Sequence, residues 1–373
     1  MQATFDTKAL YKVLSVLMKG VPQKSPIPIL DNFLFEAKEG MVFITSFDLE
    51  NRITATVNTI MIQGDDTAFA VPAKIFTTLL ATLPEGEMTI QHTLGDNTLI
   101  CQWGNGSSVL PVFDSIDFPQ LSFDETNAKC VSFAQSFLRS AMSKTCTAVG
   151  DEDKLRSVLS GILFDIRNDA SNFVASDKQV LVCIDSPVTG DMKFILPSKC
   201  ASIIKTLFEK SGDVKVKYDG KTVNFEFGQY HINAKTIDAK YPNYTKIISV
   251  NNPHTMVVER ESLCAAVRRV MVCANSSSKM IRFKMSFNEA EITGEDLMYG
   301  VTAKETITCD YDGDDLEIGF KAPALHTLLA NMESKTVEIR FLESNKPTII
   351  TPSPEDAKDE PIKSVIMPMV ISK

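Results

Sequence analysis

The sequence predicts an α+β fold made of three similar domains, each with two helices and about eight short strands in a duplicated β-α-β-β-β pattern. The first reason is a Phe-x-x-Pro segment that begins at Phe69, Phe194 and Phe320, at intervals of 125 and 126 residues. The second is that a helix start, at Phe5, Phe133 and Val258, recurs at a similar interval. A repeat of this length is the size of a whole domain, whereas a solenoid unit has roughly 20 to 50 residues.

The first half of the first repeat shows the pattern that we expect in all three. Apolar residues at helical spacing predict a first helix from Lys8 to Met18. β-branched and aromatic residues that alternate with polar ones then predict strands over 30–36, 41–45 and 52–57. A strand end followed by an acidic turn recurs in each repeat, at Ile44–Asp48, Val174–Asp177 and Ile292–Glu295.

The second half of the repeat predicts another helix and another group of strands. The helix is expected from Pro72 to Leu83, because proline suits the first helical turn. Strands are expected over 88–112, with Asn105-Gly106 as a hairpin turn. Two polar, turn-rich stretches, at residues 122–129 and 249–253, interrupt the periodic pattern. They predict domain boundaries that divide the chain into 1–127, 128–253 and 254–373.

Composition is typical of a soluble globular protein. The 373 residues carry 38 basic and 47 acidic side chains, a net charge of -9, and 44% of them are apolar. The amino terminus lacks the pattern of a signal peptide, and no apolar run reaches the roughly 18 residues of a membrane helix. We therefore expect a cytoplasmic protein. Its eight scattered cysteines have no zinc-finger spacing, which favours reduced thiols over disulfides or a metal site.

Basic residues gather on helices, and acidic residues gather in turns. Lys8, Lys12 and Lys19 form a stripe opposite the apolar face of the first helix, with no acidic residue in the stripe. Similar basic positions occur on later helices, namely Arg139, Lys199, Lys205, Arg268 and Arg269. Lysines without interleaved aromatic residues would contact phosphates and not bases, which favours sequence-independent DNA binding. The alternative that the residues leave open is an ordinary solvated lysine face on each helix.

Several motifs in chain order resemble those of a known family. They are Pro28–Asn32, Phe47–Glu50, Val71–Lys74, Leu83–Gly86, Asp117–Pro119, Tyr241–Tyr244 and Val365–Met369. Together with the threefold repeat, they make the chain similar to the bacterial DNA polymerase III beta subunit, the sliding clamp, over nearly its full length. The resemblance implies a processivity factor and not an enzyme. It also implies a head-to-tail homodimeric ring of clamp domains around double-stranded DNA, with helices lining the hole.

The resemblance implies two sets of contacts with DNA and with the second copy. Lys24 and Lys74 match positions that are basic in the family, and Arg156 matches in part. The expected DNA-binding residues are Lys8, Lys12, Lys19, Lys24, Lys74, Arg139, Arg156, Lys199 and Lys205. Leu110 and Val272 match apolar positions of the dimer interface, while Ser108 is more polar than the family pattern.

The resemblance further implies a groove between the second and third domains for short peptides of partner proteins. These partners would be the catalytic subunit of the replicative polymerase, the clamp loader, and other polymerases and repair proteins that carry clamp-binding peptides. The matching positions are Leu159, Ser176, Val180, Leu181, Pro242, Lys246, Ile247, Val365, Met367, Pro368 and Met369. Apolar side chains with flexible methionines suit several different peptides. Alternatively, Leu181, Ile247 and Val365 are simple core residues.

Other function classes have weaker support in the sequence. No nucleotide-binding, metalloprotease or serine-hydrolase motif occurs, and we expect no cofactor. A Ser-His-Asp site assembled from distant segments is the enzyme alternative. Asp310–Asp314 begins like a calcium loop but lacks its glycine and glutamate, which favours a hairpin turn. A β-rich scaffold that assembles through sheet edges would share the fold but would not bind DNA in a salt-sensitive way.

Overall fold

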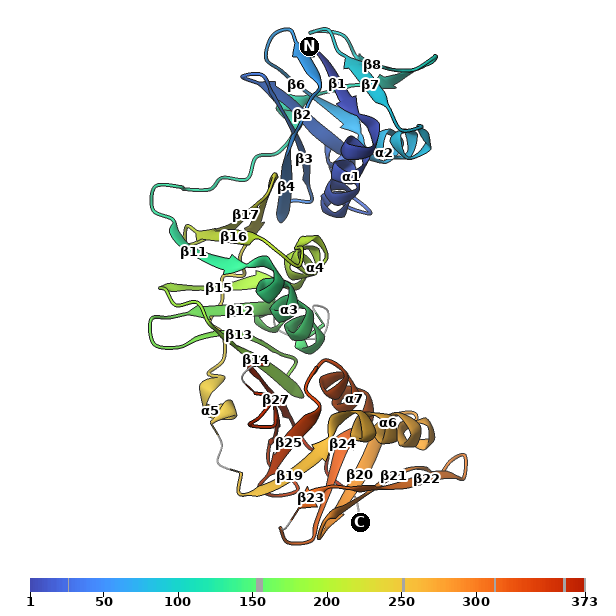
Figure 1. Cartoon of the computed structure of the whole chain (residues 1–373), viewed down its shortest axis with the longest axis vertical. Coiled ribbons are helices and arrows are strands. Elements are labelled where there is room, and N and C mark those ends of the chain that lie inside the picture. The colour runs from blue at the N-terminus through green and yellow to red at the C-terminus, as the bar shows by residue number, and fades with distance from the viewer. Residues whose placement is uncertain (26, 152–156, 250–251, 312, 358–359, 372–373) are drawn as a thin grey trace. The chain divides into compact units, whose positions relative to one another are not determined.

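The structure is a computed structural model that describes residues 1–25, 27–151, 157–249, 252–311, 313–357 and 360–371 (Figure 1). The elements of the first repeat are β1 (Gln2–Asp6), α1 (Thr7–Leu17), η1 (Met18–Gly20), η2 (Pro28–Asp31), β2 (Asn32–Lys38), β3 (Met41–Phe47), β4 (Asn51–Val57), β5 (Met61–Gln63), β6 (Thr67–Pro72), α2 (Ala73–Thr82), β7 (Glu87–Gln91), β8 (Thr98–Trp103), β9 (Gly106–Pro111), β10 (Phe113–Asp114) and η3 (Ser115–Asp117).

The second repeat has the same order of elements. They are β11 (Lys129–Ala134), α3 (Gln135–Thr145), η4 (Cys146–Ala148), η5 (Ser157–Leu159), β12 (Gly161–Ile166), β13 (Ser171–Ser176), β14 (Val180–Ser186), β15 (Met192–Pro197), α4 (Ser198–Leu207), β16 (Asp213–Tyr218), β17 (Thr222–Phe227), β18 (Tyr230–Lys235) and the short α5 (Thr245–Ile248).

The third repeat follows the same plan again. Its elements are β19 (His254–Glu259), α6 (Arg260–Val270), η6 (Met271–Cys273), β20 (Met280–Ser286), β21 (Glu289–Asp296), β22 (Val301–Thr308), β23 (Asp310–Tyr311), β24 (Leu316–Lys321), α7 (Ala322–Ala330), β25 (Thr336–Phe341), β26 (Thr348–Pro352) and β27 (Ile362–Ile366). Apart from the short strands β5, β10 and β23, the short α5 and the 3₁₀ turns, each repeat is a β-α-β-β-β unit written twice within the described residues. The predicted α+β fold of three repeated domains is confirmed.

The first helix shows why these residues form a helix here. Asp6 caps it, because its side chain accepts a hydrogen bond of 2.7 Å from the backbone N–H of Ala9. Leu10, Leu14 and Leu17 are buried on one face, as their spacing predicts. The helix spans Thr7–Leu17, one residue earlier than expected, and continues as a 3₁₀ turn.

The predicted Asn105-Gly106 turn is wrong by one residue. Trp103 pairs with Gly106 in the β8–β9 ladder, so Gly104 and Asn105 are the two turn residues. Gly104 has a φ of +45°, which glycine adopts readily. Gly106 is needed for packing, because a Cβ at that position would lie 2.7 Å from the indole of Trp103.

The chain packs into two compact units that do not coincide with the three repeats. The first unit contains residues 1–138 and 206–236, and the second contains 139–205 and 237–373. The dividing line runs through α3 and α4 of the middle repeat. Boundaries near 127 and 253 remain a prediction about the repeats, and the packing is organised by sheets that join neighbouring repeats.

The first unit contains two antiparallel sheets. Strands of the first repeat alone form a five-stranded sheet in the order β5-β1-β7-β8-β9. A nine-stranded sheet, β10-β6-β2-β3-β4-β18-β17-β16-β11, joins the first repeat to the second. The joining pair is β4 with β18, in which Ile53 lies opposite Ile232. We call this pairing the first joint.

The second unit repeats that arrangement with the next pair of repeats. A nine-stranded sheet, β15-β12-β13-β14-β27-β26-β25-β19-β23, joins the second repeat to the third. Here β14 pairs with β27, and Val182 lies opposite Ser364. We call this pairing the second joint. Strands of the third repeat alone form a four-stranded sheet in the order β22-β21-β20-β24.

The cysteines lie partly in the core and partly at the surface. None of the eight cysteines, all of which the structure describes, forms a disulfide, and four of them are buried, namely Cys101, Cys183, Cys200 and Cys309. Burial raises the pKa of the Cys101 thiol to about 12, so it is an inert thiol at neutral pH. Within the described residues, no helix is long and apolar enough to cross a membrane, and no group of His, Cys, Asp and Glu could hold a metal ion.

Candidate functional site

The predicted basic stripe of the first unit lies on exposed helix surface. α1 and α2 pack together, and Lys8, Lys12 and Lys74 are exposed on them. Lys19 follows in η1, and Lys24 lies in the loop before η2, both also exposed. Among the described residues, Lys12, Lys24 and Lys74 form no ion pair with a carboxylate. The structure therefore presents these ammonium groups to solvent.

The stripe is not free of acidic residues, which corrects the prediction from the helix alone. Lys8 Nζ lies 2.6 Å from Glu85 Oε1, which belongs to the loop after α2. The acid is 77 positions away in sequence, so a helix wheel cannot show it. Lys19 Nζ instead donates a hydrogen bond of 3.1 Å to the hydroxyl of Thr206 in α4.

The predicted basic residues of the second unit come from α3 and α4. Arg139 and Lys199 are exposed, while Lys205 is half-buried. The positive charge of Lys205 lies near the thiol of Cys146, whose pKa is nevertheless raised because burial outweighs that charge. Arg156, also predicted to bind DNA, lies outside the described residues.

A basic recess on α6 and α7 contains residues that the sequence analysis only partly identified. The recess has a volume of about 520 Å³ and is lined in part by Arg260, Arg268 and His326. Arg269 also borders it, but its guanidinium donates to both oxygens of Glu305 on β22. Arg260 lies on the same helix face as Arg268, but its guanidinium donates to the backbone oxygen of Ser334 at 2.7 Å and forms an ion pair with Glu261.

An apolar cluster in the second unit collects much of the predicted peptide groove. Leu159, Leu181 and Val365 are buried in it, and Ile247 is half-buried against it. The cluster also contains Tyr241 and Tyr244 from the segment before α5. Leu181 and Val365 are thus buried, as the alternative interpretation of them as core residues requires. They lie on strands on either side of the second joint, directly opposite each other.

The remaining groove positions lie around this cluster. Pro242, Lys246 and Met367 are exposed, while Ser176, Pro368 and Met369 are half-exposed. Val180 is buried but belongs to the opposite face of β14 from Leu181, because neighbouring strand residues alternate. The structure therefore separates Val180 from the cluster that contains Leu181.

Backbone hydrogen bonds hold the segment after β27 in place. Met367 N donates to Gln179 O at 2.8 Å, and Met369 N donates to Gly319 O on β24, also at 2.8 Å. Lys321 Nζ donates to the side chain of Gln179 at 3.0 Å. Met367 is thus an exposed, flexible side chain on an ordered backbone beside the apolar cluster.

Asp165 is a polar residue of this region that the sequence analysis missed. Its carboxylate is buried, and Oδ2 accepts a hydrogen bond of 2.8 Å from the hydroxyl of Tyr244. Lys193 Nζ lies 3.3 Å from Oδ1, and Arg167 Nε lies 3.8 Å away. Burial, and then the bond to Asp165, raise the pKa of the Tyr244 hydroxyl. No sequence signal marks Asp165, because it lies in the buried run of β12.

Each of the four sheets ends in two edge strands, and β9 and β22 are two of these edges. β9 is the outer strand of the five-stranded sheet, and β22 is the outer strand of the four-stranded sheet. Leu110, on β9, has its side chain buried within its own repeat. Val272, in η6, is 78% exposed.

Sequence comparison identifies all three repeats. The N-terminal domain of the DNA polymerase III beta subunit matches residues 1–122, the central domain matches 132–243, and the C-terminal domain matches 245–370. The chain belongs to the DNA polymerase III beta subunit family. Members of this family are sliding clamps, non-catalytic processivity factors of DNA replication.

Full-length relatives and solved structures agree with this assignment. The beta sliding clamp of Caulobacter vibrioides (strain NA1000 / CB15N) is 27% identical over 99% of this chain and 100% of its own length. The beta sliding clamp of Chlamydia pneumoniae is also 27% identical, with 99% of each chain covered. The DnaN sliding clamp of Pseudomonas aeruginosa bound to griselimycin superposes with a TM-score of 0.92 at 23% identity and covers both chains fully, which shows the shared clamp fold.

A further solved clamp has a molecule bound at a named region. The C. crescentus beta sliding clamp was crystallised with polyethylene glycol bound to a proposed beta-motif tethering region. It has a TM-score of 0.90 and 25% identity, and both chains are covered fully. Like these proteins, the clamp described here consists of three β-rich domains of duplicated pattern.

Proposed function

We propose that two copies of this clamp close head to tail into a ring around double-stranded DNA. The observation that carries the proposal is the pair of sheets that end at β9 and β22. Each joint within the chain makes a nine-stranded sheet from five strands of one repeat and four of another. The two remaining sheets have five and four strands, so pairing β22 of one copy with β9 of the next would make a third sheet of nine.

The internal repeat supports the choice of these two edges. β4, β14 and β22 are each the last strand of the first β-α-β-β-β unit of their repeat. β18, β27 and β9 are each the last strand of the second unit. β4 pairs with β18, and β14 pairs with β27. The equivalent third pairing is β22 with β9, and it requires a second copy. Leu110 and Val272 would contribute to this interface.

DNA would be held by its phosphates and not by its bases. Lys8, Lys12, Lys19, Lys24, Lys74, Arg139, Arg156, Lys199 and Lys205 remain the proposed contacts, to which we add Arg268 and His326. Exposed lysines in a protein of net charge -9 suit weak, mobile and salt-sensitive binding. A closed ring is retained by its topology, so tight contacts are unnecessary.

Partner proteins would bind at the apolar cluster beside the second joint. We propose that Leu159, Leu181, Ile247 and Val365 form its floor, with Met367, Pro242 and Lys246 at the rim. The partners are the catalytic subunit of the replicative polymerase, the clamp loader, and other polymerases and repair proteins with clamp-binding peptides. Because all of these act on chromosomal DNA, we also propose a cytoplasmic location.

The test of the ring is its retention on circular DNA. The clamp is placed on a nicked plasmid with its cognate loader, and the plasmid is then cut once with a restriction enzyme. A ring that slides on DNA is expected to leave the linear molecule by its ends. On a plasmid that was not cut, the ring is expected to stay bound. Retention on the cut plasmid, or release from the circle at moderate salt, would indicate an ordinary DNA-binding surface instead.

A further inference from the structure

We propose that the tip of the β21–β22 hairpin, residues Leu297, Met298 and Tyr299, docks on the end of β9 in a second copy of the chain. The inference rests on the two-copy ring proposed above. It adds to that ring a hydrophobic contact beyond Leu110 and Val272, and a register for the strands. We call these three residues the 297–299 tip.

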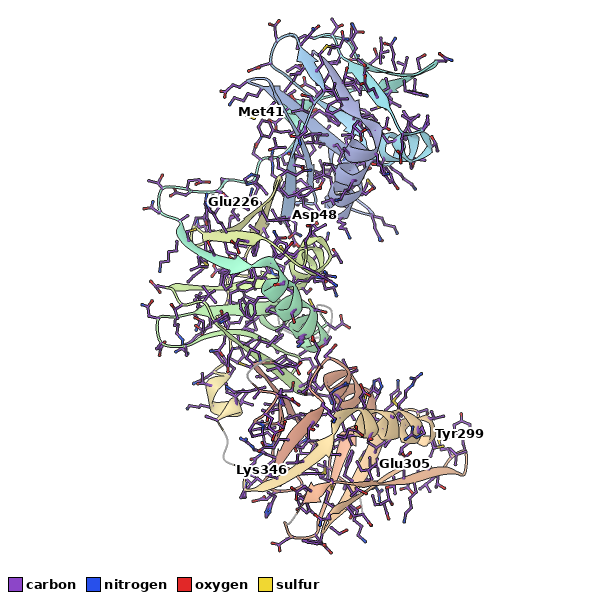
Figure 2. All side chains as sticks on the ribbon, in the orientation of Figure 1. Met41, Asp48, Glu226, Tyr299, Glu305 and Lys346 are labelled. Carbon is purple, nitrogen blue, oxygen red and sulfur yellow. The ribbon has the colours of Figure 1, made fainter. Side chains whose placement is uncertain are left out.

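The 297–299 tip is an unusual run of exposed apolar residues. Leu297, Met298 and Tyr299 are 84%, 85% and 74% exposed. Figure 2 shows Tyr299 at the outer end of its hairpin, with Glu305 farther along β22. Consecutive exposed apolar side chains of this size mark an interaction site more often than isolated ones do. Such a surface is expected to be covered in the working form of the protein.

The backbone of the tip is anchored and not free. Asp296 is buried, and its Oδ1 accepts a hydrogen bond of 3.0 Å from the backbone N–H of Met298. Its Oδ2 accepts another, also of 3.0 Å, from Ser276 N. Because one buried carboxylate ties the tip to the segment after η6, the tip presents its apolar side chains in a defined position. Preorganisation of this kind lowers the entropy cost of binding.

The register of the missing joint follows from the two joints within the chain. Phe69, Phe194 and Phe320 occupy the same position in their repeats. If the paired residue is followed from strand to strand across each sheet, starting from these three, the same steps lead to the residue two positions after Ile53, Val182 and Val301, which are therefore equivalent. The same procedure, started from the equivalent residues Phe5, Phe133 and Val258, leads to the residue two positions before Ser108, Ile232 and Ser364, which are therefore equivalent to one another.

Both known joints obey this equivalence. Ile53 lies opposite Ile232 in the first joint, and Val182 lies opposite Ser364 in the second. The third joint therefore places Val301 opposite Ser108 of the second copy. Since the joints are antiparallel, the residues before Val301 run beside those after Ser108. The 297–299 tip then lies beside Leu110 and the residues that follow it.

The segment of the second copy beside the tip is itself apolar and exposed. Val109 is exposed on β9, and Phe113 and Ile116 are exposed just after it. Nothing in β9 is charged, since its sequence is Gly-Ser-Ser-Val-Leu-Pro. Exposed edge strands are usually protected by charged residues or proline, and β9 has a proline only at its last position. An uncharged edge flanked by apolar side chains fits an edge that is paired.

The charges of β22 do not oppose the pairing. Lys304 forms an ion pair with Glu291 on the neighbouring strand β21. Glu305 accepts from Arg269 on α6, with an Nε to Oε2 distance of 2.9 Å. Each charge on β22 thus has a partner within its own repeat, so docking would bury no unpaired charge. These features favour a second copy of the chain as the occupant.

The first experiment compares dimer dissociation in the full-length chain. The triple variant Leu297→Ser, Met298→Ser, Tyr299→Ser removes the apolar surface and leaves Asp296 in place. The control is Phe287→Ser, because Phe287 is 74% exposed at the β20–β21 hairpin of the same repeat. Sedimentation equilibrium over a dilution series gives the dissociation constant of each, and circular dichroism checks folding.

We expect the dissociation constant to rise roughly 100-fold in the triple variant and less than about threefold in the control. A dimeric wild type with an unchanged triple variant would overturn the docking of the tip and leave the ring intact. A wild type that is monomeric at every concentration would overturn the ring, and the tip proposal with it.

The second experiment tests the register directly. Ser108→Cys and Val301→Cys are combined in a Cys130→Ser background, because Cys130 is the exposed native cysteine. A short bis-maleimide should link the copies efficiently at these positions. The control pair, Ser108→Cys with Thr308→Cys, is displaced by seven residues along β22 and should link poorly. Equal yields from the two pairs would contradict the register.

Discussion

The two joints have the same architecture but different side chains. The first pairs β4 with β18, and the second pairs β14 with β27, each within a nine-stranded sheet. Beside the first lies a small cluster of buried Leu30, Leu34, Phe47 and Phe118. Beside the second lies a larger cluster that includes Tyr244, which is bound to a buried carboxylate. The repeated strand order therefore explains why both joints form, whereas the side chains of the two clusters make the joints different.

The difference is visible in the segments that follow the two joining strands. After β18 the chain continues into the second unit. After β27 the backbone N–H groups of Met367 and Met369 donate hydrogen bonds to the backbone oxygens of Gln179 and Gly319. The second joint thus has flexible apolar side chains at its surface. This comparison teaches that one strand pairing can carry different surfaces, and it is why we propose partner binding at the second joint alone.

The largest expected effect on stability comes from replacing one large buried side chain by alanine in each of the two clusters. Phe118→Ala beside the first joint should lower the free energy of unfolding by about 4 kcal/mol, and Leu181→Ala beside the second by about 3 kcal/mol, because both side chains are buried. Urea unfolding measures both. Only Leu181→Ala should weaken binding of a fluorescent peptide from the cognate polymerase, measured by anisotropy. Equal peptide loss in both variants would remove the distinction between the joints.

The next largest effect concerns a buried ion pair just before β27. Glu360 Oε1 accepts a hydrogen bond from Lys144 Nζ, with a distance of 2.6 Å between the two atoms. The carboxylate also accepts hydrogen bonds from the backbone N–H groups of Glu333 and Ser334. Glu360→Ala should cost about 3 kcal/mol of unfolding free energy, since it leaves the two backbone N–H groups without their acceptor and leaves Lys144 with only Glu333 as a partner. The exposed Glu355→Ala is the control and should change stability by less than about 0.5 kcal/mol.

The same carboxylate predicts a pH dependence. Burial alone would raise the pKa of Glu360, but its hydrogen bonds to Lys144, Glu333 and Ser334 outweigh burial and lower that pKa. A lowered pKa in the folded state stabilises the protein fully above the ordinary glutamate pKa of about 4.3. This contribution is lost as the pH falls through the lowered value. In Glu360→Ala that part of the acid-induced loss of stability should be absent from urea titrations between pH 3 and pH 6.

A smaller effect tests the polar partner of the second cluster. Asp165→Ala leaves the buried hydroxyl of Tyr244 without its acceptor and should cost about 2 kcal/mol of unfolding free energy. Peptide affinity should fall as well, because Tyr244 is part of the cluster. Asp165→Asn keeps an acceptor oxygen and should recover most of that affinity. If Asp165→Ala binds peptide as the wild type does, Asp165 has no role in positioning the site.

The smallest effect on stability should accompany a clear effect on binding. Met367 is exposed, so Met367→Ala should change the unfolding free energy by less than about 0.5 kcal/mol. Peptide affinity should nevertheless fall about tenfold, because a flexible apolar contact is lost. The matched control is Met41→Ala, an exposed methionine of the first repeat, which should leave peptide affinity unchanged.

The repeat made the fold predictable, because the same landmarks mark the same strand and helix junctions three times. The turn at Gly104 was misplaced because the need for glycine at 106 comes from Trp103 and not from the turn itself. The two compact units were not predictable either. They arise from β4–β18 and β14–β27 pairing between repeats, and a pattern within one repeat carries no information about such pairing.

The candidate site was predictable in its apolar residues and less so in its charged ones. Leu159, Leu181 and Val365, which the resemblance assigned to a peptide groove, lie in one buried cluster, and peptide binding there stays a prediction. Glu85 beside Lys8 and Asp165 beside Tyr244 were missed, because each pair joins residues far apart in the sequence. Long-range polar contacts of this kind depend on the packed fold and have no local signature.

The most direct test of the third joint is the solution mass of the clamp, measured by light scattering across a dilution series. Pairing of β22 with β9 predicts a mass near twice that of the 41.2 kDa chain, falling toward one chain only at high dilution. A mass of one chain at all concentrations would contradict the closed ring and leave both edge strands without a partner.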